Sequence, residues 1–149
     1  MNGYMFDTNI FNNILDGKVD PSLLDGKGCF ATHVQHDEIQ ATTDKTRRSA
    51  LEAIFSIAFQ LPTESFVLDV SRPNEAKLSD GVLFEEMRER LDKMNKKRRN
   101  NSQDVLIAET AINNGLILVT HDRDLYLVTT EFGGAACNMH YVLKPIQTT

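Results

Sequence analysis

Four acidic residues stand where an α/β chain would bring them together in one pocket. Asp7 ends the first apolar run of the chain, and Asp122 follows the most strand-like run of its second half. Glu38 lies within an expected helix, and Asp104 is expected to open a later one. Because strand ends and helix starts share one edge of a parallel sheet, where such folds place their sites, we expect these four carboxylates to meet there.

A pocket that gathers several carboxylates has a defined chemistry. The carboxylates repel one another, and all of them stay ionised only if a cation neutralises them. Ligands that are all oxygen suit Mg²⁺ or Mn²⁺. Such a metal polarises a phosphate and lowers the pKa of a bound water, so the pattern indicates metal-assisted hydrolysis, most often of a phosphodiester. Taken singly, each acid is also compatible with a helix cap, a turn or a surface position.

The elements that must position these acids alternate between short apolar runs and helical patterns. Strands are expected at residues 3–6, 29–31, 66–68, 116–119 and 138–143. Helices are expected at residues 8–16, 33–42, 44–61, from about 74 to 96, and 102–113, with a short helix after residue 121. Thr8, Asp44 and Ser102 are the expected N-caps, and Gly17 and Gly115 the expected stops. This alternation predicts an α/β fold, a three-layer α/β/α sandwich with a mostly parallel sheet.

Composition limits the class of protein. The 149 residues suit one domain, and the 41% of hydrophobic residues can supply its core. No apolar run approaches the roughly 20 residues of a membrane span, and we find no secretory signal. Cys29 and Cys137 lie in apolar surroundings without metal-ligand spacing, which favours reduced core residues. We therefore expect a cytoplasmic protein that does not associate with membranes.

Charge is unevenly distributed along the chain. The net charge of −5 argues against broad, non-specific nucleic-acid binding. Nevertheless, five of the 16 basic residues fall within seven positions, namely Lys93, Lys96, Lys97, Arg98 and Arg99. A basic rim beside an acidic pocket would suit a polyanion that is cut at a metal, so residues 96–99 are candidate phosphate contacts. The same run is equally compatible with a solvated helix end.

Four segments resemble the motifs of PIN domains, in the same order and over nearly the whole chain. They are Met5-Phe6-Asp7-Thr8-Asn9, Glu38-Ile39, the segment from Asp104 to Ala111, and the segment from Leu118 to Leu125. The resemblance implies one PIN-like nuclease domain over residues 1–149. Chain length points within this family to the VapC-type toxins of prokaryotic toxin–antitoxin pairs.

The resemblance also implies roles for individual residues. It implies a Mg²⁺- or Mn²⁺-dependent ribonuclease that leaves 5′-phosphate and 3′-hydroxyl ends. The implied catalytic residues are Asp7, Glu38, Asp104 and Asp122, and the implied metal ligands are Asp7, Asp104, Asp122 and Asp124. Asn9 and Thr120 would orient the carboxylates through hydrogen bonds. Glu38 or Asp122 would position or deprotonate the attacking water.

The expected partners are an RNA substrate, a cognate antitoxin that covers the site, and a second copy of the chain. The helix expected to end near residue 61 carries Ile54, Phe55, Ile57, Ala58 and Phe59 around its circumference. A helix that is apolar nearly all round is buried on more than one side, which favours a homodimer or burial under the antitoxin. Two alternatives stay open: a PIN-like nuclease of RNA processing or of DNA outside any toxin pair, and a catalytically inactive PIN-like module that binds nucleic acid or regulates.

Overall fold

Five parallel strands form one sheet at the centre of the part of the chain that the structure describes. The computed structural model describes residues 3–24, 26–63, 81–96 and 98–142. The strands are β1 (Tyr4–Phe6), β2 (Cys29–Ala31), β3 (Phe59–Gln60), β4 (Ile117–Val119) and β5 (Ala135–Cys137). They lie in the order β3-β2-β1-β4-β5, and every neighbouring pair is parallel. The predicted parallel sheet is confirmed.

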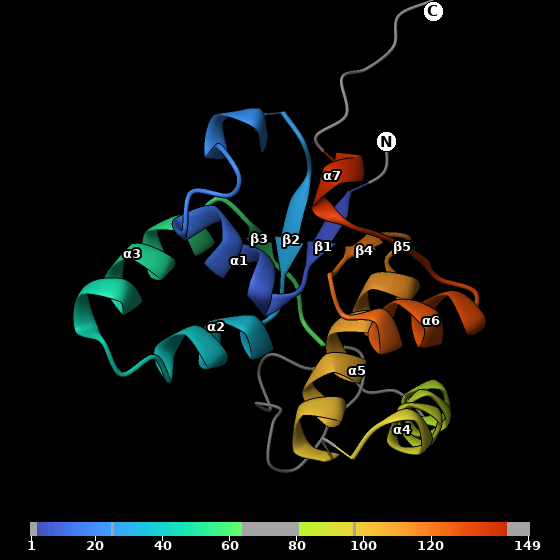
Figure 1. Cartoon of the computed structure of the whole chain (residues 1–149). Helices are drawn as coiled ribbons and strands as arrows, with labels where there is room; N and C mark the ends of the chain where they lie inside the picture. The colour runs from blue at the N-terminus through green and yellow to red at the C-terminus, as the bar shows by residue number, and fades with distance from the viewer. Residues whose placement is uncertain (1–2, 25, 64–80, 97, 143–149) are drawn as a thin grey trace, which may run out of the picture.

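Helices cover both faces of this sheet. They are α1 (Thr8–Leu15), α2 (His33–Gln40), α3 (Lys45–Phe55), α4 (Val82–Met94), α5 (Arg98–Asn113), α6 (Arg123–Glu131) and α7 (Met139–Val142), with a 3₁₀ turn η1 at Pro21–Leu24. Helices α1 and α3 lie on one side, and α4, α5 and α6 lie on the other (Figure 1). The three-layer α/β/α sandwich is therefore confirmed.

The alternation of strand side chains divides the core in two. Successive residues of a strand point to opposite faces. Accordingly, Phe6 and Val119 pack with α1, α3 and α7, whereas Met5 and Leu118 pack with α4, α5 and α6. All four of these side chains are fully buried. Short apolar runs suffice for these strands because both of their faces are covered.

The strand order reverses beside β1. The chain runs from β1 through β2 to β3 on one side, and then returns to place β4 against the other edge of β1. The backbone N–H of Asp7 donates to the carbonyl of Val119 over 3.0 Å, which joins the two strand ends. In open α/β sheets the crevice at such a reversal, outside the carboxyl ends of the strands, is the usual ligand site.

Two predicted helix starts are wrong. Asp7, not Thr8, caps α1, because its side chain accepts a hydrogen bond from the backbone N–H of Thr8 over 2.8 Å. Helix α5 begins at Arg98, so Ser102 is not its cap and Asp104 lies in its second turn. The buried Asn101 side chain donates to Asp92 of α4 over 2.8 Å. This contact between helices stabilises the first turn of α5, which lies before the predicted start of the helix at residue 102.

The helix predicted over residues 44–61 is too long. Asp44 does cap α3, but the helix ends at Phe55, where the Ser56 hydroxyl donates to the carbonyl of Ala53. Phe59 then pairs with Phe30 of β2, and their ring centroids lie 5.9 Å apart. Pairing with the sheet therefore overrides helix periodicity, and the argument for a helix that is apolar all round no longer holds.

The final predicted strand, at residues 138–143, is wrong where the structure describes it. The strand lies earlier, at β5, and Asn138 accepts a hydrogen bond from the backbone N–H of Tyr141, which starts α7. Gly134, directly before β5, is closely packed, because an added Cβ would lie 2.7 Å from a side-chain carbon of Ile112. The predicted strand at 66–68 and the helix expected from about residue 74 as far as residue 80 fall outside the described residues.

Several smaller predictions are borne out. Gly17 and Gly115 follow α1 and α5 with φ angles of 78° and 66°, which favour glycine. Cys29 and Cys137 are free and buried, and burial raises the pKa of both thiols to about 11. Among the helices of the described segments, none combines the length and apolar character needed to cross a bilayer.

Candidate active site

The four predicted acids line one pocket at the reversal of strand order. This acidic pocket has a volume of about 200 Å³ and is lined by Asp7, Thr8, Asn9, Glu38, Asn100, Gln103, Asp104 and Asp122. Its residues come from the end of β1, from α1, α2 and α5, and from the loop after β4. Every described residue of the lining is acidic or polar, so the pocket is suited to a hydrated cation rather than to an apolar ligand.

Asp7 is the most deeply buried of these acids, with 6% of its surface exposed. One carboxylate oxygen accepts a hydrogen bond from the backbone N–H of Thr8, and the other accepts one from the Thr120 hydroxyl, each over 2.8 Å. Burial raises the pKa of Asp7, as does the Asp122 charge, although the two hydrogen bonds act in the opposite direction. Asp7 thus caps α1 and also presents negative charge to the pocket.

Thr120 links two of the acids. Its hydroxyl donates to Asp7 and accepts from the backbone N–H of Asp122 over 3.0 Å. Asp122 in turn caps α6, since its carboxylate accepts from the backbone N–H of Leu125 over 3.1 Å. Thr120 therefore contacts both Asp7 and Asp122, and its role in orienting the carboxylates stays a prediction.

Glu38 reaches the pocket from α2, which is held firmly against β1. Thr32 and Gln35 form a capping box at the start of α2, and the Gln35 amide donates to the carbonyl of Phe6 over 3.0 Å. Glu38 lies one turn after Gln35, on the same side of the helix. Burial raises the pKa of Glu38 to about 7, with a smaller contribution from the Asp7 charge and an opposing one from the nearby Thr8 hydroxyl.

Asp104 approaches from the other layer of the sandwich. It is partly buried in the second turn of α5, where Asn100 and Gln103 also border the pocket. The helix start containing Arg98 and Arg99 therefore lies next to the acids. Lys96, just before it, is exposed, and Lys97 falls outside the described residues.

Of the remaining predicted residues, one lines the acidic pocket and the other does not. Asn9 lines the acidic pocket. Asp124 is not among the lining residues, and its carboxylate instead accepts a 3.4 Å hydrogen bond from Asn95, which follows α4. His121, which directly precedes Asp122, is exposed.

Several residues that build the pocket carry little signal in the sequence. Thr8 lines it, and Gln103 and Asn100 contribute polar groups from α5. Thr8 does have a sequence signal, because it lies between Asp7 and Asn9, which are both predicted site residues. Gln35 was missed because a buried glutamine that supports a strand end has no distinctive pattern on an otherwise polar helix.

The donor set fits Mg²⁺ or Mn²⁺. The side chains that face the pocket offer carboxylate, amide and hydroxyl oxygens. Without a cation, the raised pKa values of Asp7 and Glu38 show that the pocket disfavours its own negative charge. Within the described residues, no three acidic, histidine or cysteine side chains lie close enough together to enclose an ion. Ionised carboxylates repel one another, and a cation bound between them would offset that repulsion.

Comparisons with solved structures agree with the fold of this chain. A chain in the crystal structure of VapBC2 from Rickettsia felis, bound to a DNA fragment from their promoter, is 19% identical, with a TM-score of 0.59 over 91% of this chain and 97% of that chain. VapBC-1 from nontypeable Haemophilus influenzae gives 16% identity and a TM-score of 0.58, over 92% of this chain and 98% of that one. PAE2754 from Pyrobaculum aerophilum gives 17% identity and a TM-score of 0.55, over 95% of this chain and 94% of that one.

At these identities the structural matches establish the fold alone. A comparison with curated protein sequences finds no match. The family model described as "PIN domain" matches residues 4–130. That span contains the acidic pocket and the whole sheet except β5. The chain therefore belongs to the PIN domain family.

Proposed function

We propose that this chain is a divalent-metal-dependent endoribonuclease, the toxin of a VapBC-type toxin–antitoxin pair, and that residues 1–149 act as one nuclease domain. The observation that carries the proposal is the acidic pocket, where Asp7, Glu38, Asp104 and Asp122 converge from separate elements. Membership of the PIN domain family supports a nuclease. The similarity in fold to chains of VapBC complexes supports an antitoxin partner.

Asp7, Asp104 and Asp122 are the proposed ligands of Mg²⁺ or Mn²⁺, and Asp124 is a fourth if its bond to Asn95 is exchanged for the metal. When bound, the metal polarises the scissile phosphate and lowers the pKa of a water molecule. Thr120 holds the Asp7 carboxylate in place, and the capping bond to Leu125 holds that of Asp122. Asn9 is proposed to orient a carboxylate or a water through its side-chain amide.

Glu38 is the acid best suited to accept a proton from the attacking water. A general base works best when its pKa lies near the operating pH, and the pKa of Glu38 is about 7 without a metal. Asp122 is less free to do so, because one of its oxygens caps α6. Water attacks phosphorus, its proton passes to the Glu38 carboxylate, the bond from phosphorus to the 3′ oxygen breaks, and the leaving 3′ oxygen takes a proton from solvent water. The products are a 5′-phosphate and a 3′-hydroxyl.

We also propose that the protein is cytoplasmic and forms a homodimer. Three large exposed side chains support association. Tyr126 and Leu127 belong to α6, which precedes strand β5 at the edge of the described sheet, and Tyr141 belongs to α7, which follows it; they are 41%, 37% and 53% exposed. The two tyrosines also line a hollow of about 540 Å³ beside that strand. Burying such side chains against a second copy would remove substantial apolar surface from water.

The decisive experiment compares RNA and DNA oligonucleotides of the same sequence, incubated with the purified chain in Mn²⁺ or in EDTA. We expect cleavage of RNA alone, dependent on the metal, with 5′-phosphate ends. Preferential cleavage of DNA would favour a nuclease outside any toxin pair. Failure to cleave, together with no Mn²⁺ binding by isothermal titration, would favour the inactive module.

A further inference from the structure

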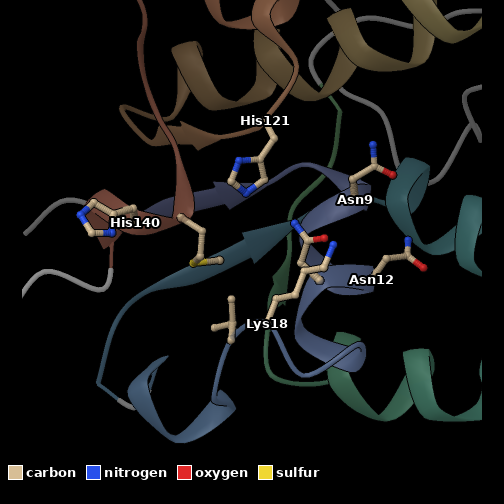
Figure 2. A pocket seen from close by; sticks show the side chains of 8 residues that line it. Asn9, Asn12, Lys18, His121 and His140 are labelled. Atoms are coloured by element: carbon tan, nitrogen blue, oxygen red, sulfur yellow. The ribbon is translucent and has the colours of Figure 1, made fainter.

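A second and larger pocket adjoins the acidic one. It has a volume of about 640 Å³ and is lined by Asn9, Asn12, Asn13, Lys18, Val19, His121, Met139 and His140. We call it the amide pocket. Asn9 lines both pockets, and His121 directly precedes Asp122. Figure 2 shows Lys18 and His121 entering the amide pocket from different elements, with His140 at its far end. A polymer bound at the acids would therefore pass next to this pocket.

The two pockets differ in charge. Among the described residues, none that lines the amide pocket is acidic, and Lys18 supplies a positive charge at its exposed rim. The acidic pocket suits a cation, whereas the amide pocket suits a ligand with anionic and hydrogen-bonding groups. Its volume falls within the roughly 300–1,000 Å³ of small-molecule sites, which is enough for one nucleotide.

The side chains of the amide pocket match the parts of a nucleotide. Carboxamides donate and accept hydrogen bonds, as the edges of unpaired bases require. The Asn12 oxygen is already engaged by Arg47 over 2.9 Å, but within the described residues the side chains of Asn9 and Asn13 make no hydrogen bond. An imidazole ring such as that of His121 can stack on a base, and an ammonium such as that of Lys18 can contact a phosphate.

We propose that the amide pocket binds the nucleotide next to the scissile phosphate of a single-stranded RNA. Asn13 contacts the base edge, Lys18 contacts the adjoining phosphate, and both act as positioning residues rather than catalytic ones. This inference rests on the proposed function, because it takes RNA to be the substrate. It adds a binding site that favours some bases over others and lies outside the metal centre.

The test measures RNA affinity separately from cleavage. The probe is a labelled, single-stranded oligoribonucleotide pool of random sequence, and Asp104→Asn blocks cleavage throughout. Adding Lys18→Gln or Asn13→Ala should each weaken binding about 5-fold, the loss of one hydrogen bond or a modest charged contact. Lys18→Gln should also reduce the slope of log affinity against log salt by about 0.7. Lys45→Gln and Asn113→Ala are matched controls, since both residues are exposed and lie outside the pocket.

A second readout uses the active chain. Asn13→Ala should raise KM with little change in kcat, weaken the base preference at one position beside the cut, and leave Mn²⁺ affinity unchanged. RNA affinities of both pocket variants equal to those of the controls would overturn the proposal, whatever the cleavage activity. If the wild-type chain cuts no RNA but the pocket variants still bind RNA more weakly than the controls, the proposed function fails, whereas the assignment of the amide pocket as an RNA-binding site stands.

Discussion

Glu38 offers a quantitative test of how the acidic pocket manages its charge. Its pKa lies at about 7 in the folded, metal-free chain, against 4.5 for an ordinary glutamate. Below pH 4.5 Glu38 is protonated whether the chain is folded or not, so burial costs nothing. Above pH 7 it is charged in both states, and the folded state alone bears the cost of a buried charge. The free energy of unfolding of the metal-free protein should therefore fall as the pH rises from 4.5 to 7.

The size of this effect follows from the difference between the two pKa values. At about 1.36 kcal/mol for each pH unit, the upper limit is roughly 3 kcal/mol. Because Glu38 is only partly buried, solvent screens part of its charge, and we expect about 2 kcal/mol. Glu38→Gln removes this titration. The variant should match the wild type near pH 4 and exceed its stability by about 2 kcal/mol at pH 8.

The assay is urea denaturation in EDTA at a series of pH values, with Glu86→Gln as the control. Glu86 is an exposed acid on α4 and does not line the pocket. Adding Mn²⁺ at pH 8 should stabilise the wild type more than Glu38→Gln, because the cation favours the ionised carboxylate. The reasoning would be refuted if Glu38→Gln and the wild type were equally stable at pH 8. It would also be refuted if their difference in free energy of unfolding were the same at all pH values.

Three further predictions concern the neighbouring features. Asp7→Asn should abolish cleavage but keep or raise the free energy of unfolding. Asp7→Ala should lower the free energy of unfolding by about 1 kcal/mol, measured by urea denaturation, because the cap of α1 is missing. Equal stability of the two variants would argue against the capping role. Changing the four basic residues at 96–99 to glutamine should weaken RNA binding at every sequence and flatten its salt dependence by about 0.7 for each lost contact. If the wild type and the variant show the same slope of log affinity against log salt, these residues do not contact RNA phosphates and form part of the solvated surface. Tyr126→Ser with Tyr141→Ser should convert a dimer to a monomer in light scattering, and an unchanged mass would place the interface elsewhere.

The layers of the fold were predictable because they depend on simple periodicities. Runs such as Leu116 to Val119 are too apolar for an exposed loop and too short for a helix, and their alternation with helical patterns indicates a parallel sheet. The gathering of Asp7, Glu38, Asp104 and Asp122 followed from that topology together with the family motifs.

The misplaced boundaries have a common cause: contacts between elements that local sequence does not encode. Helix α5 starts early because the side chain of Asn101 reaches Asp92, and α3 stops early because Phe59 pairs with β2. The small residues of β5 carry little strand propensity and form a strand because β4 lies beside them. Supporting residues such as Gln35 were missed for the same reason, since their role depends on the strand end that they contact.

The most direct test of the central claim is cleavage of a labelled RNA under single-turnover conditions, with Mn²⁺ titrated against wild type and Asp104→Asn. If the acidic pocket is a metal-dependent ribonuclease site, wild-type cleavage should rise with Mn²⁺, vanish in EDTA and be lost in Asp104→Asn, while the variant keeps its folded circular dichroism spectrum. Cleavage that persists in EDTA, or full activity in Asp104→Asn, would contradict the account.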